Sequence, residues 1–537
     1  MLPAALRRVT DGVTPYFCLL LAIVTLGPHQ FGFHLAELNA PQDVITCHQR
    51  GIVPNANKIP GMTLPQCIPM TEAQFATVSS VFTVGGLIGA LVAGPFCSRE
   101  GRLLAMRLTA VVFLLGSITE TFAPSVAVLA IGRVLNGLSA GASTVIVPLY
   151  ISEVAPVQSR GFFGAFTQIT VNIGILFTQT LGFFLSHGSA WRYILGTGIV
   201  LAFIQFVGLL GVPESPAWLA ARGGDGEEGK TLQAKRILQR IRGTTVNLDD
   251  EVAHWPSAAG SAEEQALLAG AATNTTDTHL SAAEQYDVDA DEGIVTVAPP
   301  SPRGPTPLGG GANKTKAKAP VGFFELLVDS YYRPALIAVI GIMFAQQVCG
   351  INSVIMYSVS LLNGMLPLNS ALLTIIISCV NLVTTMLSAP LPDRLGRKTC
   401  LLISVIGQGI SSLVLAFSIV YGVKILSAFS VLTFVAFFAV GLGPVPFILA
   451  SELVGQEAVG ATQSWALGAN YVATFLVAQF FPLVNTALNN RFGGAGWVYF
   501  LFAMFAFLST IFFWFYVPET NGKKDADEVW GRTSRID

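Results

Sequence analysis

Three carboxamide side chains lie in the middle of a long apolar stretch, residues 339–361. Gln346, Gln347 and Asn352 have no charged residue beside them, and Gly350 lies among them. In hydrocarbon an unsatisfied amide costs several kcal/mol. An unbroken helix would turn Gln346 and Asn352 about 240° apart. We therefore expect the helix to open at Gly350, as helices do at the solute sites of transporters. Alternatively, the amides only tie helices together.

Ionisable side chains occur at the end of the first apolar stretch. His34 and Glu37 are one helical turn apart, and histidine titrates near neutral pH. A buried carboxylate needs a partner, for which Arg133 is the best candidate. These residues form either a fixed ion pair with a neutral His34 or a site that couples proton binding to function.

Further polar or helix-breaking residues interrupt other apolar stretches. The segment GLGPVPF contains two glycines together with Pro444 and Pro446, which should break a helix. Gln168, Asn381 and Asn470 each add one amide to another stretch. Because amides both donate and accept hydrogen bonds, these groups suit a neutral polyhydroxyl solute.

The composition is that of a polytopic membrane protein. Of 537 residues, 52% are hydrophobic and 12% are charged, and the mean hydropathy is +0.61. So little charge cannot cover a soluble protein of this length. The apolar stretches predict an all-α membrane protein with twelve transmembrane helices. The predicted helices span residues 14–38, 73–95, 104–122, 124–149, 162–186, 192–212, 335–361, 369–390, 400–422, 426–450, 462–486 and 497–517.

Lys and Arg in the short loops predict cytosolic termini, because most of them then lie on the inner side. The first apolar run is too long for the core of a signal peptide and has no A-x-A cleavage site, so it should remain as the first helix. Residues 46–71 then form an outer loop containing Cys47 and Cys67. A disulfide between them suits that oxidising side, although both can equally be free thiols.

Two sequence features occur twice at nearly the same separation, which indicates a six-helix unit present in two copies. GPFCSREGR returns as APLPDRLGRK, and VPLYISE returns as VPFILASE. The arginines and the glutamates can latch the inner face while the outer side is open, and would have to break for the opposite state. Alternatively, the arginines only face headgroups. The residues concerned are Arg99, Arg102, Glu153, Arg394, Arg397 and Glu452.

The pattern divides the chain into four parts. Residues 1–220 and 323–518 are the two six-helix halves, and residues 519–537 are a short cytosolic tail. The linker, residues 221–322, begins with helix-like basic sequence and continues as a segment poor in large apolar residues, which predicts disorder. Asn274 and Asn313 head its two glycosylation sequons and should stay bare in the cytosol.

The motifs, in order, resemble those of the sugar porters of the major facilitator superfamily, the group of facilitative glucose transporters and proton-coupled hexose symporters. The resemblance covers almost the whole membrane portion. The matching motifs are QFG at 30–32, NAPQ at 39–42, GRVLNG at 132–137, PLYISEVAP at 148–156, RG at 160–161, PESP at 213–216, QQVCGIN at 346–352, DRLGRK at 393–398 and PET at 518–520.

The resemblance implies the twelve-helix major facilitator fold and a sugar site between its halves. Tyr357 would lie at the outer gate beside the Pro444 and Pro446 break, and Arg160 and Glu214 would join the cytosolic latch. The linker would begin with the family's cytosolic helical domain. The implied site residues are Gln168, Ile175, Gln346, Gln347, Asn352, Asn381, Gly443, Phe447 and Asn470.

Several positions depart from the glucose carriers. Met343 replaces a sugar-binding Gln, Ala439 and Phe447 replace a Glu and a Trp, and Tyr471 replaces a Trp. The preferred sugar can therefore be another hexose, a pentose or a polyol. His34 stands where related symporters have Asp and facilitators commonly have Asn, so it matches neither class.

The sequence thus predicts a carrier that moves a monosaccharide, most of all a hexose, by alternating access, as a uniporter or as a proton symporter. Two alternatives stay open: a sugar sensor that does not transport, and a carrier of a polyol, an inositol or another small organic solute. The chain lacks G-x-x-x-x-G-K-[ST], which argues against a nucleotide-driven pump. We expect no enzyme activity, cofactor, metal or nucleic-acid partner. We expect the protein to function as a monomer, in the plasma membrane or the vacuolar membrane.

Overall fold

The computed structural model describes residues 13–48, 64–156, 159–222, 228–243, 248, 252, 325–362, 370–455, 458–523 and 526–532. Twelve helices in this described part are long and apolar enough to cross a membrane. The predicted all-α class and the number of spans are thereby confirmed. Asn274 and Asn313 lie outside the described residues, as does most of the 221–322 linker.

The N-terminal half contains the first six spans, and two helices follow it. The helices of the half are α2 (Pro15–Val24), α3 (Leu26–Ala36), α4 (Gln42–Ile45), α5 (Glu72–Glu100), α6 (Arg102–Thr121), α7 (Val126–Val154), α8 (Arg160–Leu185) and α9 (Trp191–Leu210). The two that follow are α10 (Pro216–Arg222) and α11 (Glu228–Arg242).

The C-terminal half contains the remaining six spans. Its helices are α14 (Glu325–Val328), α15 (Arg333–Val348), α16 (Ile351–Leu362), α17 (Ser370–Ser388), α18 (Leu391–Leu395), α19 (Arg397–Val420), α20 (Lys424–Val440), α21 (Val445–Glu452), α22 (Val459–Phe492), α23 (Val498–Tyr516) and α24 (Ala526–Val529).

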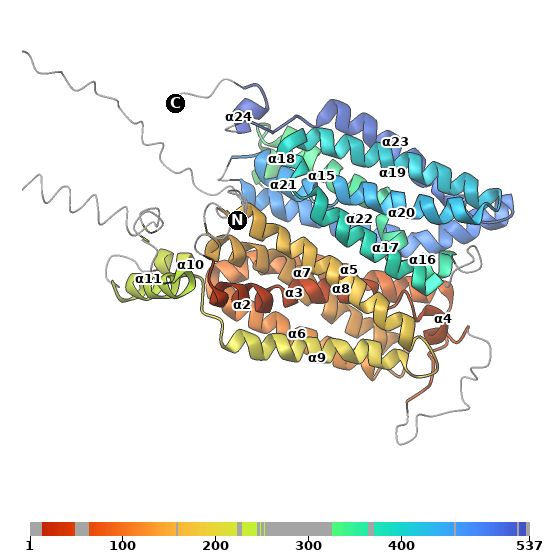
Figure 1. The fold of residues 1–537 in the computed structure, drawn as a ribbon, viewed down its shortest axis with the longest axis horizontal. Coiled ribbons are helices and arrows are strands. Elements are labelled where there is room, and N and C mark those ends of the chain that lie inside the picture. Colours follow the sequence, from red (N-terminus) through yellow and green to blue (C-terminus); the bar gives the residue numbers. More distant parts are fainter. Residues whose placement is uncertain are drawn as a thin grey trace, which may run out of the picture.

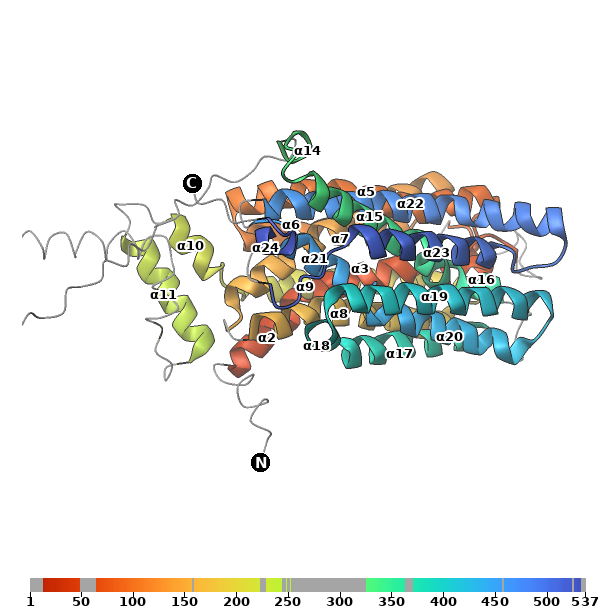
Figure 2. The same ribbon diagram turned by 90° about the horizontal axis from the view of Figure 1, so that it is seen from above.

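The two halves lie side by side with their long helices roughly parallel (Figure 1). They meet where α5 packs against α22 and where α8 packs against α17. Helices α10 and α11 lie at one end of the bundle, which we call the α11 end (Figure 2). The opposite end, which carries α4 and the bond between Cys47 and Cys67, is called the disulfide end.

Three spans are broken within the bundle. The first changes from α2 to α3 at Thr25. The seventh breaks between α15 and α16, where Gly350 has a φ of +99° that favours glycine. The tenth breaks between α20 and α21, in the segment that ends at Pro444. The sequence predicted the second and third breaks from their glycines and prolines, and the structure confirms them.

Helices α5 and α7 approach each other through glycines on both. A Cβ on Gly85 would lie 2.2 Å from the carbonyl oxygen of Val134, and one on Gly89 would lie 2.0 Å from that of Leu138. Gly137 of α7 faces the carbonyl of Phe82 in the same way, at 2.0 Å. Small residues four apart allow such close backbone contact inside membranes.

The loop at the disulfide end is fastened to the bundle. Cys47 and Cys67 form a disulfide, and the indole of Trp191 donates to the carbonyl of Gln66 at 2.9 Å. The Arg192 guanidinium donates to three backbone carbonyls around it. The described ends of this loop, residues 46–48 and 64–71, are therefore tied to each other and to the N-terminal half.

Candidate solute site between the two halves

The break of the seventh span carries a cluster of uncharged amides. Gln346 Nε2 donates to the carbonyl oxygens of Leu442, at 2.5 Å, and Gly443, at 3.3 Å, in the break of the tenth span. Gln346 Oε1 accepts from Asn470 of α22 at 2.5 Å and from Gln347 at 3.1 Å. Both broken spans of the C-terminal half therefore meet at Gln346.

Asn352 joins this cluster from the other side of the break. Its Nδ2 donates to Gln347 Oε1 at 2.5 Å and to Thr474 Oγ1 at 3.3 Å. A straight helix would point Asn352 away from the glutamines. The turn at Gly350 instead places the amides of α15 and α16 in one network, as the sequence predicted.

A second amide group connects the halves. Asn172 of α8 accepts from Asn381 Nδ2 at 3.2 Å and donates to Thr385 Oγ1 at 3.0 Å, both on α17. Gln168, one turn before Asn172, donates to Asn172 Oδ1 at 3.5 Å, the oxygen that also accepts from Asn381. A solute that replaced these bonds would touch both halves at once.

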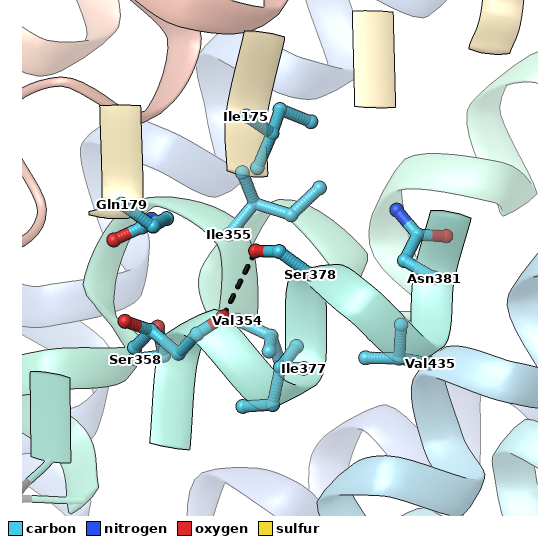
Figure 3. A pocket seen from close by; sticks show the side chains of 10 residues that line it. Ile175, Gln179, Val354, Ile355, Ser358, Ile377, Ser378, Asn381 and Val435 are labelled. Carbon is cyan, nitrogen blue, oxygen red and sulfur yellow. Dashed lines mark hydrogen bonds between the residues drawn. The ribbon is translucent and has the colours of Figure 1, made fainter. Parts of the chain in front are cut away.

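A small cavity lies beside Asn381, between α8 of one half and α16 and α17 of the other. Figure 3 shows Ile175 and Gln179 on one side of it and Ser358 and Ser378 on the other. It has room for about one water molecule. Ile175 and Asn381 therefore line the path between the halves, and the path is narrow at this level.

On the α11 side of these amides, short segments of α8 and α22 are partly exposed. Every residue of α8 from 164 to 170 is partly exposed, and so is every residue of α22 from 467 to 470. Gln168 and Asn470 lie on these segments and are themselves partly exposed.

Toward the disulfide end, hydrogen bonds bridge the two halves. Asn39 donates to the carbonyl of Ile355 and to Ser358 Oγ, both at 2.9 Å, and its oxygen accepts from the backbone N–H of Val359 at 3.1 Å. Closer to the surface, Glu72 accepts from the hydroxyl of Thr486 at 3.0 Å. These bonds link α16 and α22 to the N-terminal half.

Tyr357 belongs to these contacts between the halves, where the resemblance placed the outer gate. Its buried ring meets the ring of Phe75 of α5 edge-on at 6.3 Å. Its hydroxyl donates to the carbonyl of Ala478 at 2.8 Å. The side chain thus touches both halves above the amides.

The remaining predicted site residues lie around the break of the tenth span. Gly443 takes part through its carbonyl, and Pro444 and Pro446 begin α21. Met343 is buried, with its sulfur 3.9 Å from Asn470 Nδ2. Phe447 is 36% exposed and lies one turn further toward the α11 end. Phe447 is therefore set apart from the amide cluster.

The ionisable residues of the first span form a separate, fully buried cluster. Arg133 NH1 donates to Glu37 Oε1 and to the carbonyl of His34, both at 2.6 Å. His34 Nδ1 lies 2.9 Å from Glu37 Oε2. The predicted partnership of Glu37 with Arg133 is present, and Glu120 of α6 lies beside it.

The repeated arginine–glutamate pairs lie at the α11 end. Arg102 meets Glu153 at 2.7 Å, and Arg397 meets Glu452 at 2.9 Å. Each pair lies within one half, and both are formed while hydrogen bonds bridge the halves toward the disulfide end. Each pair braces helices of the same six-helix unit, and its opening in the opposite state of the cycle stays a prediction.

Other members of the predicted latch lie elsewhere. Arg99 is exposed and pairs with its neighbour Glu100 at 3.4 Å, and Arg394 is exposed. Arg160 begins α8, and its side chain lies outside the described part. The paired arginines are thus the second of each R-x-x-R turn.

Glu214, which the resemblance placed in the latch, binds backbone N–H groups at the α11 end. It accepts from the N–H groups of Arg102, at 2.9 Å, and Leu103, at 3.1 Å, at the start of α6. Glu519 does the same for Arg397, at 2.8 Å, and its neighbour at the start of α19. Carboxylates stabilise helix N-termini in this way.

Sequence reasoning missed Asn172, Glu120 and Glu519. Asn172 follows Gln168 by one turn, a spacing that puts both on one helix face. Glu519 occupies the same place in PET as Glu214 in PESP, so the internal repeat contained the signal. Glu120 gave no local signal, because it stands at a predicted helix end where an acid is ordinary.

Comparison with known proteins gives the family. The model of the family "Sugar (and other) transporter" matches residues 20–277 and 312–529. A probable metabolite transport protein of Saccharomyces cerevisiae is 30% identical over 98% of this chain and 97% of its own. Human facilitated glucose transporter member 3 is 29% identical over 96% of this chain and 92% of its own.

Solved structures show the same fold. The xylose transporter XylE from E. coli in its inward-open conformation matches with a TM-score of 0.67, 21% identity and coverage of 96% of this chain and 99% of its own. XylE bound to 6-bromo-6-deoxy-D-glucose matches with a TM-score of 0.64. The chain has the major facilitator fold and belongs to the sugar (and other) transporter family, whose members carry solutes across membranes.

Proposed function

We propose that this protein carries a monosaccharide, a hexose above all, across the membrane through the amide groups between its halves. The observation that carries the proposal is the character of these groups. Gln346, Gln347, Asn352 and Asn470 on one side and Gln168 on the other are all neutral, and each has both donors and acceptors. Hydroxyl groups of a sugar can replace the amide–amide bonds one for one.

The relatives support a sugar as the solute. A glucose transporter is among the proteins that match over almost the whole chain, and a solved relative is a proton:xylose symporter. The fold of that relative supports carriage by alternating access, in which the amides face one side at a time. The bilayer is the only other partner this mechanism requires.

The orientation is part of the proposal. With the α11 end in the cytosol, the closed disulfide end faces outward and the structure is the inward-facing state. The Lys and Arg distribution supports this assignment. Maleimide labelling of single cysteines in intact cells tests it: a cysteine at Lys424, near the disulfide end, should react from outside, and one at Arg99 should not. The reverse pattern would invert the orientation.

Uptake into proteoliposomes is the decisive experiment for the solute. Labelled hexoses, pentoses and polyols are offered one at a time, with and without an inward proton gradient. A hexose carrier concentrates or equilibrates a hexose fastest. A polyol carrier prefers inositol or another polyol, and a sensor binds label without letting it accumulate, so either result would overturn the proposal.

Two variants connect the uptake to the site. Asn470→Ala removes a donor to Gln346 and should reduce uptake of the preferred sugar at least tenfold, since it removes a bond in a buried network. Asn490→Ala, on the same helix but exposed at the disulfide end, is the matched control and should leave uptake unchanged. Equal uptake by both variants would place the solute elsewhere.

A further inference from the structure

Glu120 is a fully buried carboxyl group for which the described residues provide no hydrogen-bond donor. Both of its carboxyl oxygens are without a partner and without contact with water. One of its oxygens lies within 4.8 Å of a Glu37 oxygen and of a ring nitrogen of His34. A buried carboxylate without a donor is strongly destabilised, so the group requires a charge or a proton.

Glycines on two helices make room for the side chains of this cluster. A Cβ on Gly132 of α7 would lie 2.4 Å from Glu120 Cγ. A Cβ on Gly198 of α9 would lie 2.8 Å from a carbon of the His34 ring. Glu120 therefore occupies a space that the surrounding helices leave for it, and it is not held at an open helix end.

The charges of the cluster do not balance. Glu37 receives a bond from the guanidinium of Arg133, which favours its ionised form, and its other oxygen lies 2.9 Å from His34 Nδ1. One guanidinium compensates one carboxylate. A second carboxylate so close to Glu37 has no counter-charge, because the other guanidinium nearby, that of Arg192, is turned to backbone carbonyls. Two buried like charges at this range cannot both persist.

His34 is a poor place for the missing positive charge. Its ring stacks on Phe113 at 5.5 Å and meets Phe33 edge-on at 5.3 Å. Its second nitrogen has only the Ser117 hydroxyl, at 3.5 Å. An imidazolium needs an acceptor at both nitrogens. A metal ion fits no better, because Arg133 already occupies the Glu37 oxygen on its side.

We propose that Glu120 binds one proton, so that Glu37 and Glu120 together hold a single negative charge opposite Arg133. In this state the carboxyl of Glu120 is neutral and that of Glu37 is ionised. No covalent step is involved: the proton comes from water and returns to it. The cluster lies near the closed disulfide end, and the proton can exchange only when that end opens.

This site deepens the proposed function, on which its transport role rests. If the proton is released and rebound in each cycle, sugar movement is linked to protons through Glu120. The proton would then enter from the disulfide end together with the sugar. Glu120→Gln is neutral in every state and should therefore break the link.

Infrared difference spectroscopy of the full-length protein in liposomes tests the proton directly. Wild type should show, at neutral pH, the carbonyl stretch of one protonated carboxylic acid that Glu120→Gln lacks. Glu37→Gln should lack it too, because the remaining Glu120 then ionises opposite Arg133. Glu100→Gln, an exposed acid, is the control and should retain it. No such band in wild type, or its survival in Glu120→Gln, overturns the proposal.

The transport experiment compares wild type with Glu120→Gln. With an inward proton gradient, wild type should accumulate sugar above its outside concentration, whereas Glu120→Gln should reach a ratio of one and still exchange labelled for unlabelled sugar. Uphill accumulation by Glu120→Gln would overturn the coupling role. So would the absence of uphill accumulation in both wild type and Glu120→Gln. Absence of any sugar movement in wild type would instead contradict the proposed function and leave the infrared result standing.

Discussion

The first span of each half is broken, and each of these two spans carries a buried polar cluster of different chemistry. Near the end of α3, in the N-terminal half, lie two acids, a histidine and an arginine, all buried. At the break between α15 and α16, in the C-terminal half, lies a cluster of uncharged amides. The two copies of one six-helix unit have thus diverged into a charged cluster and a neutral one.

The difference indicates that the two clusters are suited to different bound species. Buried charges are expensive and hold fixed geometry through strong bonds, whereas amides exchange one neutral partner for another at little cost. The C-terminal cluster is therefore suited to a neutral solute that comes and goes. The N-terminal cluster is suited to a proton, because only a small ion can enter without disturbing its packing.

The largest effect is expected from removing the charge that the N-terminal cluster depends on. Arg133→Leu leaves Glu37 buried without its guanidinium and should lower the free energy of unfolding by about 3–5 kcal/mol. Thermal or denaturant unfolding in detergent micelles measures it. Arg99→Leu, at an arginine with 85% of its side chain exposed, should change stability by less than about 0.5 kcal/mol. Similar losses in both variants would contradict a special role for the N-terminal cluster.

The matching change in the C-terminal cluster should affect transport more than stability. Gln346→Leu removes the residue at which both broken spans meet, and uptake should fall about tenfold to hundredfold, the equivalent of one or two buried hydrogen bonds. Initial rates in proteoliposomes measure it. Gln408→Leu replaces a buried glutamine of the same half outside the amide cluster, and should retain uptake. Loss in the control alone would reverse the assignment.

A third test asks where the two halves remain alike. Glu214→Ala and Glu519→Ala each remove a carboxylate that accepts N–H bonds at a helix start, and each should cost about 0.5–2 kcal/mol of stability. Because the geometry is repeated, the two losses should agree within about 0.5 kcal/mol in denaturant unfolding. A large discrepancy would show that the α11 ends have diverged as well.

The smallest effect is expected at a direct contact between the halves. Tyr471→Phe removes only the hydroxyl that lies 3.4 Å from Thr144 Oγ1 and keeps the ring packed on Gly86. Uptake should change less than about threefold, because a long neutral bond contributes below about 1 kcal/mol. A tenfold change would mean that this hydroxyl belongs to the solute site.

The sequence predicted those structural features that depend on only a few residues. The spans follow from apolar length, and the breaks follow from Gly350 and from GLGPVPF, since glycine and proline act within one helical turn. The link between Glu37 and Arg133 was found by elimination, because a buried acid needs a base. Each of these inferences requires only a few residues at a time.

What it did not predict depends on contacts between distant helices. Glu120 stands at the end of α6, and only the packing of α3, α6 and α7 reveals that it is buried beside Glu37. The arrangement of the arginine pairs depends on such contacts as well. Spacing brought the right partners together, but only the fold shows that each pair joins helices of one half.

The glycine contacts between α5 and α7 have a mechanical consequence. Helices whose backbones touch cannot slide or tilt without collision, so α5 and α7 should move through the transport cycle as one rigid unit. The C-terminal half has its two interrupted spans at the solute instead, and its backbone can flex there. Most of the backbone bending that alternately exposes the sugar should therefore occur in the C-terminal half, while the N-terminal half stays rigid.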